Sequence, residues 1–334
     1  MTARLRQWLE ETHSDTFELV RHFLARFFDT EIGASAGDWH KLAIGAFATL
    51  VSLGLLGLQV YQARFRILQD DAFSTRQLYH ATVHADFLGL LAITMALTAL
   101  LTLLQWQSLF PSLRDYMALT GFPVSARQIF AAKFGALVLV FAAYAISLTG
   151  PLAGFFGWVI RGNWQENPSG TVLTAATFAA LAGASAFVFF ALLALQGVLL
   201  NFVPGRWFLR VSLFVQAVLF IATVGALPLL GRQPHSAAWW PPVWFVWLWD
   251  ALVTGHASAR PALLAVVLPA VLAVLSYLLS YHRYRKLLLE APPAHAGGHS
   301  GLGSRLLEWW SRTRASRPPS LSPGKPWRAA AFTA

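Results

Sequence analysis

Two histidines and two aspartates are the residues of this chain whose types and spacing could carry chemistry. His80 and His84 stand four residues apart, a spacing that places both side chains on one helical face and can hold a metal ion. Ala81 occupies the position where the metalloprotease motif needs glutamate, so that motif is absent. Together with Asp86 and Asp250, the histidines are the groups available to a membrane-embedded enzyme. We expect a polar interfacial face instead, and predict no metal, no cofactor and no catalytic residue.

Two further kinds of site are excluded by the sequence. The chain contains no cysteine, which rules out structural disulfides, thiolate metal sites and cysteine catalysis. It also lacks the G-x-x-x-x-G-K-[ST] pattern of a phosphate-binding loop, because Gly324-Lys325 is followed by Pro326 and is not preceded by the required glycine. The chain therefore cannot hydrolyse ATP with a P-loop.

The elements that would position any site are membrane helices. Of the 334 residues, 56% are hydrophobic and 12% are charged, whereas a soluble domain carries about 25% charged residues. Six windows lack Asp, Glu, Lys and Arg, and each can hold the roughly 20 apolar residues that cross a bilayer as a helix. The windows are residues 42–63, 87–113, 134–160, 167–205, 211–231 and 261–282. The sequence thus predicts an all-α, polytopic bundle of six transmembrane helices over residues 42–281.

The segments on either side of this bundle are predicted to be cytoplasmic. Residues 1–41 contain an amphipathic helix, which can lie in the headgroup plane or pack on the protein's own cytoplasmic surface. The tail, residues 282–334, has nine basic and two acidic residues, a net +7 of the chain's +10, and is largely of disordered composition. Anionic lipid headgroups account for this charge, so no nucleic acid is expected as a partner. The Lys and Arg bias of the loops also places both termini inside.

The connection between the second and third windows, residues 105–133, lies on the cytoplasmic side in this orientation. Pro111 can begin a helix that residues 112–119 continue, and Pro123 prevents its continuation. Ser125 can then cap the next membrane helix. The product is a short cytoplasmic helix rigidly joined to two membrane helices, which can carry motion from a soluble partner into the bundle. A passive loop with ordinary turns is the alternative.

A motif runs through this connection. Its residues are Trp106, Leu109, Phe110, Pro111, Arg114, Asp115, Tyr116, Leu119, Pro123, Val124, Phe130, Ala132 and Lys133. They resemble the first cytoplasmic loop of bacterial ABC-type exporter permeases of the second type, in particular a poorly characterised group with the pattern W-x-x-L-F-P-x-x-R-D-Y-x-x-L-x-x-x-P-V. The similarity covers about residues 85–255 and fits the six-span layout. Gly121-Phe122-Pro123 departs from the Pro-Leu-Pro of many members.

The resemblance implies a permease of the bacterial cytoplasmic (inner) membrane, with a coupling helix that docks on a separate ABC ATPase subunit. The coupling residues carried over are Phe110, Pro111, Leu113, Arg114, Asp115, Tyr116, Met117, Leu119 and Pro123. A second permease copy or a related permease half would complete the pathway, and the chain is either complete or half of a longer permease. The six windows hold no charged proton relay, which favours an external energy source. A non-transporting membrane scaffold or assembly protein and a membrane-embedded enzyme remain the alternatives.

Overall fold

The computed structural model describes residues 19–24, 44–45, 48–49, 51–52, 55, 62, 76–110, 126–161, 168–226 and 238–290. Within these ranges the chain is helical apart from short turns and connections, and it contains no strand. The chain divides into two units, residues 1–286 and 287–334, and every contact described below lies in the first. The all-α class predicted from the sequence is confirmed for this part of the chain.

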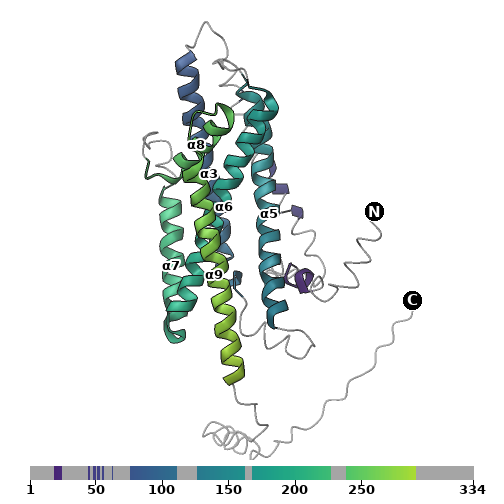
Figure 1. Cartoon of the computed structure of the whole chain (residues 1–334), viewed down its shortest axis with the longest axis vertical. Helices are drawn as coiled ribbons and strands as arrows, with labels where there is room; N and C mark the ends of the chain where they lie inside the picture. Colours follow the sequence, from purple (N-terminus) through teal and green to yellow (C-terminus); the bar gives the residue numbers. More distant parts are fainter. Residues whose placement is uncertain are drawn as a thin grey trace, which may run out of the picture. The chain divides into compact units, whose positions relative to one another are not determined.

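In the described ranges, five long helices form the bundle. They are α3 (Arg76–Leu104), α5 (Ala126–Val159), α6 (Gly170–Phe202), α7 (Gly205–Ala226) and α9 (Arg260–Glu290). A 3₁₀ turn, η1 (Trp106–Ser108), follows α3, and the short helix α8 (Pro241–Val253) precedes α9. Figure 1 shows the long helices running alongside one another, and α6 contacts α3, α5, α7 and α8. Since α3 and α6 end where α5 and α7 begin, we call this end of the bundle the loop end and the opposite end the far end.

Each long helix contains a stretch that is long and apolar enough to cross a membrane. The stretches are Gln77–Leu104, Gln128–Val159, Gly170–Phe202, Trp207–Ala226 and Arg260–Tyr281. Helices of this kind indicate a multi-pass membrane protein. The first expected span, residues 42–63, lies largely outside the described residues, although those that are described are helical. The span over residues 42–63, which would bring the total to six, therefore stays a prediction.

Two helices begin earlier than the hydrophobic windows predict. α3 starts at Arg76, so the histidine segment is the first part of a membrane helix and Asp86 lies inside it. α5 starts at Ala126, directly after Ser125, and contains Lys133, whose side chain is only 4% exposed. These two helices are thus longer than the charge-free windows, and Asp86 and Lys133 lie in the parts that extend beyond them. A charge-free window marks the section that can face lipid, whereas Lys133, just outside its window, is covered by protein contacts.

Residues 19–24 pack against the loop end of the bundle. Among residues 19–24, Leu19 and Phe23 are buried in the same hydrophobic cluster as Ile129 and Tyr277. The ammonium of Lys133 lies 5.0 Å from the centre of the Phe23 ring, a cation–π contact. For these residues the structure favours packing on the protein's own surface over a position in the headgroup plane.

A second hydrophobic cluster fills the far end. Phe87 of α3 stacks on Phe156 of α5 with ring centroids 5.5 Å apart, and lies 5.0 Å from the ring of Trp249 in α8. Trp249 is fully buried and donates through Nε1 to Thr177 Oγ1 of α6 at 3.1 Å. α8 is thus a packed part of the bundle. Its paired prolines Pro241 and Pro242 suit the first turn of a helix, where their missing N–H groups cost nothing.

Candidate functional site

The predicted coupling residues divide between described and undescribed parts of the chain. Phe110 is described, is 5% exposed and belongs to the cluster at the loop end. The others lie outside the described residues; they are Pro111, Leu113, Arg114, Asp115, Tyr116, Met117, Leu119 and Pro123. The described part of the candidate site therefore consists of the two segments that flank this connection, at the end of α3 and at the start of α5.

The end of α3 is held by side chains from two other helices. The last carbonyls of a helix have no partner within it and need one elsewhere when they are buried. Gln216 of α7 donates through Nε2 to the Leu103 carbonyl at 2.8 Å, and Gln196 of α6 donates to the carbonyl of Trp106. Trp106, which is fully buried, donates through Nε1 to Ser212 Oγ of α7 at 2.8 Å. The chain is thus fixed to α6 and α7 immediately before the predicted coupling helix.

Aromatic contacts bring the two ends of the connection together on α9. Phe110, at the leaving end, lies 4.9 Å from the ring of Tyr277. On the returning side, Phe134 and Phe130 of α5 lie 5.1 Å and 5.8 Å from the same ring. Phe130 also contacts Tyr281 at 5.4 Å. Phe110 and Phe130, which lie on either side of residues 111–125 in the sequence, therefore belong to one buried aromatic cluster.

A close approach of α6 and α9 supports this cluster from behind. A Cβ on Gly197 would overlap Ser276 Oγ and would lie 2.9 Å from Phe110 Cζ, so only glycine fits there. One turn along, Asn201 donates to the Gly197 carbonyl at 2.9 Å and to the Ser276 carbonyl at 3.0 Å. It also lies 3.3 Å from Ser280 Oγ. These hydrogen bonds fix the position of α9 relative to α6 at the loop end.

The histidine segment contributes a second polar contact, at the far end. His84 Nε2 lies 2.8 Å from Asp250 Oδ1 of α8, and His84 Nδ1 lies 2.8 Å from the carbonyl of His80. The side chains of His84 and Asp250 are 32% and 21% exposed. Since the carbonyl only accepts, Nδ1 carries a proton, and one further proton shared between Nε2 and the carboxylate completes the other bond. The pair joins α3 to α8.

This arrangement does not form the metal site that the histidine spacing permits. A metal ligand needs a ring nitrogen with a free lone pair, whereas both nitrogens of His84 face an oxygen atom. In the ranges that the structure describes, no group of three or more His, Cys, Asp or Glu residues could hold a metal ion.

Sequence reasoning named the histidines, Asp250 and Trp106, but it missed the polar side chains that hold Trp106 and the end of α3. Gln196, Ser212 and Gln216 are isolated polar residues inside charge-free windows, and polar groups within membrane helices usually face the interior of the bundle and bond to one another or to backbone carbonyls. That signal was available. Which carbonyl each side chain would reach depends on the tertiary arrangement, which the pattern does not contain.

Comparison of the chain with protein-family models, with curated proteins and with solved structures gives no match in any of the three.

Proposed function

We propose that this chain is the membrane-spanning permease subunit of an ATP-driven ABC-type transporter, an exporter of the bacterial cytoplasmic membrane. In this proposal the connection between α3 and α5 docks on a separate ATPase subunit, and two copies of the bundle, or this chain and a related half, enclose the pathway. The resemblance of residues 106–133 to the first cytoplasmic loop of such permeases is the origin of the assignment. The loop end is then the cytoplasmic end.

The observation that supports this proposal best is how the connection is attached. A segment that transmits force must make firm contacts with the helices of the bundle. Its two ends must also be held so that they cannot move independently of each other. Trp106 is bonded to α6 and α7, while Phe110 and Phe130 meet on Tyr277 of α9. A displacement of the connection would therefore act on three helices besides the two that it joins.

The energy source is expected to be external. The chain has no P-loop, and ATP hydrolysis would have to occur in a partner. Lys133 is a charged residue inside a membrane helix, but its ammonium lies over the Phe23 ring at the loop end. Within the described residues, Asp86 and Lys133 lie in different helices near opposite ends of the bundle. Arg210 lies in a third helix, near the start of α7, and charges separated in this way do not make the continuous relay that proton-coupled transport needs.

The test is co-purification with a candidate ATPase. Asp115→Ala combined with Tyr116→Ala should abolish retention of the ATPase on the tagged chain and remove any stimulation of its hydrolysis. The matched control is Trp239→Ala combined with Arg260→Ala, which removes one aromatic and one charged side chain that are exposed at the far end. If both double variants retain the ATPase equally, the coupling assignment is wrong.

A membrane-embedded enzyme is the second candidate, and the His84–Asp250 contact is the observation that favours it. A histidine oriented by a carboxylate is a common arrangement for proton transfer. Here, however, the second nitrogen is occupied by the carbonyl of its own helix, so no ring nitrogen is available to a substrate. Activity that persists without any ATPase and is lost in His84→Gln would favour the enzyme over the permease.

A further inference from the structure

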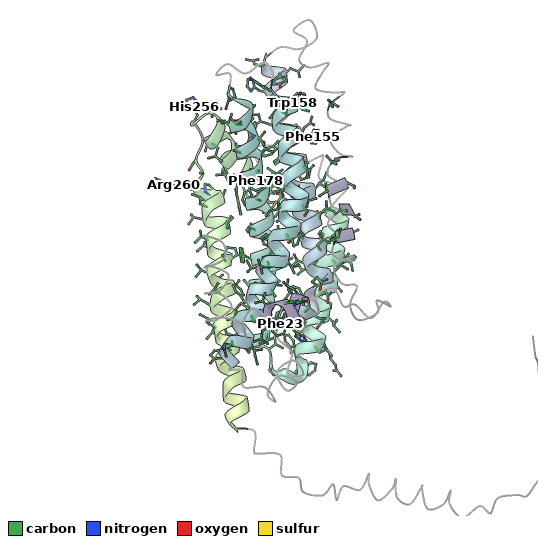
Figure 2. The ribbon with its side chains drawn as sticks, turned by 90° about the vertical axis from the view of Figure 1, so that its right-hand side faces the viewer. Phe23, Phe155, Trp158, Phe178, His256 and Arg260 are labelled. Atoms are coloured by element: carbon green, nitrogen blue, oxygen red, sulfur yellow. The ribbon has the colours of Figure 1, made fainter. Side chains whose placement is uncertain are left out.

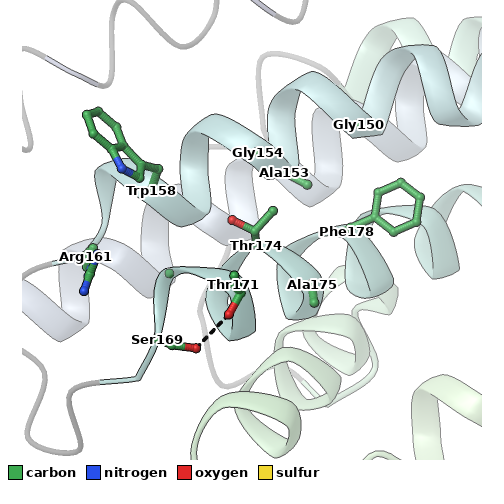
Figure 3. Close-up of a pocket in the computed structure, with 11 residues that line it drawn as sticks. Gly150, Ala153, Gly154, Trp158, Arg161, Ser169, Thr171, Thr174, Ala175 and Phe178 are labelled. Atoms are coloured by element: carbon green, nitrogen blue, oxygen red, sulfur yellow. Dashed lines mark hydrogen bonds between the residues drawn. The ribbon is translucent and has the colours of Figure 1, made fainter.

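The far end carries a groove between α5 and α6 with a volume of about 820 Å³. Gly150, Ala153 and Gly154 of α5 form its floor with Ala175 of α6, while Trp158 and Phe178 stand at its two ends (Figure 3). Neither Gly150 nor Gly154 has any atom within 4 Å of where a Cβ would lie. The volume falls in the range of roughly 300–1,000 Å³ that is usual for small-molecule sites. The groove is therefore an open, apolar channel on the outside of the bundle.

The mouth of the groove is polar and positively charged. Arg161, Ser169 and Thr171 line it, and all three are exposed. Ser169 caps α6 by accepting from the Val172 amide at 3.3 Å, and its Oγ lies 2.9 Å from Thr171 Oγ1 (Figure 3). The first amides of a helix have no partner within it, so the N-terminal end of α6 adds partial positive charge to the same place.

The surroundings of Arg161 favour the binding of an anion. The C-terminal end of α5 favours a cation at this residue, but the N-terminal end of α6 disfavours one. The side chain nevertheless lies against α6, with Nη1 3.9 Å and Cδ 3.8 Å from where a Cβ of Gly170 would be. In the described part of the chain no carboxylate pairs with this guanidinium. The positive guanidinium of Arg161 and the partly positive N-terminal end of α6 thus lie close together. An anion bound between them would relieve their repulsion.

The dimensions of the groove indicate what carries the anion. Gly150 and Trp158 are eight residues apart, which is about 12 Å along a helix, and one leaflet of the hydrocarbon layer is about 15 Å deep. Trp158 is 63% exposed and suits the headgroup level, where tryptophan concentrates. In Figure 2, Trp158 and Phe155 lie nearer the far end than Phe178, and Phe23 lies toward the loop end. The apolar channel thus runs from the headgroup level into the leaflet.

We propose that this groove binds an anionic phospholipid, with its phosphate between Arg161 and the first turn of α6 and one acyl chain along Gly150 and Gly154. Free phosphate matches the mouth but leaves the apolar channel empty. A helix of a second copy could pack on the two glycines, but its apolar surface would not neutralise Arg161. The lipid satisfies both halves of the site. This inference does not depend on the proposed ATPase.

Native mass spectrometry of the delipidated full chain, titrated with phosphatidylglycerol or with phosphatidylcholine of the same acyl chains, tests the proposal. We expect phosphatidylglycerol to bind at least about tenfold more tightly. Arg161→Gln should lower this affinity about tenfold toward that of phosphatidylcholine, because a charge-assisted bond is lost. Gly154→Leu should weaken both lipids by filling the channel. The matched controls, Arg260→Gln at the start of α9 and Gly225→Leu on the exposed side of α7, should bind as the unchanged protein does.

Several results would overturn the proposal. Equal affinity for the two lipids would show that they bind only as non-specific annular lipid around the protein. Equal losses of phosphatidylglycerol affinity in Arg161→Gln and Arg260→Gln would show the same. Displacement of phosphatidylglycerol by inorganic phosphate alone would show that the acyl channel contributes nothing. If lipid selectivity appeared only in Glu166→Gln, the chain's own carboxylate would be the anion. Because the chain has no cysteine, Gly154→Cys gives an unambiguous crosslinking test, and disulfide-linked dimers in native membranes would assign the groove to a second copy.

Discussion

Replacing Gly197 with alanine should force α6 and α9 apart at the loop end. The new Cβ would overlap Ser276 Oγ and would lie 2.6 Å from Ser276 Cβ and 2.9 Å from Phe110 Cζ. Carbon atoms in contact are normally about 3.5–4.0 Å apart, so a movement of about 1 Å is needed. Ser276 is only 4% exposed and donates its hydroxyl to the Ala273 carbonyl at 2.8 Å. Moving the Ser276 hydroxyl away would break this hydrogen bond inside the protein.

The magnitude follows from comparison with a glycine that has room. Overpacking of a well-packed core costs about 1–3 kcal/mol, while alanine gains about 1 kcal/mol over glycine in any helix interior. Gly89 of α3 has nothing within 4 Å of its Cβ position. The difference in the free energy of unfolding between Gly197→Ala and Gly89→Ala therefore measures the cost of overpacking. For a domain of this size, we expect the midpoint of thermal unfolding of Gly197→Ala to lie about 2–12 °C below that of Gly89→Ala.

The assay is thermal unfolding of the purified chain in one detergent, with retention of the candidate ATPase as a second readout. Ser276→Gly removes two of the overlapping atoms, so the cost of Gly197→Ala should be smaller in that background than in the unchanged protein. Comparison within each background cancels the intrinsic cost of the added glycine. If Gly197→Ala matches Gly89→Ala, or costs the same with and without Ser276, the close approach of α6 and α9 is not as described.

Three further predictions concern the contacts at the two ends of the bundle. Trp106→Phe and Ser212→Ala should show a coupling of about 0.6 kcal/mol, and at most about 1.7, in a double-mutant cycle of unfolding; additive effects would contradict the hydrogen bond. His84→Phe and Asp250→Leu should each lower the unfolding midpoint more than the two together, because a single change to a non-polar residue leaves the other member of the pair without its hydrogen-bond partner; a double variant less stable than both would refute this. Phe23→Ala should cost about 3–5 kcal/mol of local packing and accelerate tryptic cleavage at the exposed Arg21; an unchanged cleavage rate would show that residues 19–24 are not held by the bundle.

The sequence predicted the hydrophobic part of the fold better than its polar part. Charge-free windows located five helices that the structure contains, because a bilayer excludes both charge and irregular backbone. They did not locate the residues at which α3 and α5 begin. Asp86 and Lys133 interrupt the windows but not the helices, since Lys133 is covered by the ring of Phe23 rather than by lipid. Where protein replaces lipid, hydropathy no longer marks a boundary.

The candidate site shows the same division. The spacing of His80 and His84 correctly placed both on one helix, but it does not show that His84 bonds to Asp250 of the short helix α8, 166 residues farther along the chain. Local spacing suggested a metal site because it contains no information about α8. Trp106 was recognised as part of a motif, but its burial against Ser212 depends on α7 lying beside the end of α3.

The contacts of α7 indicate where a movement of the connection would act first. Among the described residues, the side-chain hydrogen bonds that join α7 to other helices both go to the end of α3, through Ser212 and Gln216. Farther along, α7 exposes large apolar side chains such as Phe214 and Ile221, each 70% exposed. A helix fixed by polar bonds at one end and surrounded by lipid along most of its length can tilt at little cost in packing. In the proposed permease, a displacement of Trp106 would therefore move α7 before it disturbs the α5–α6 pair, whose close contact at Gly157 and Thr174 leaves no space for sliding.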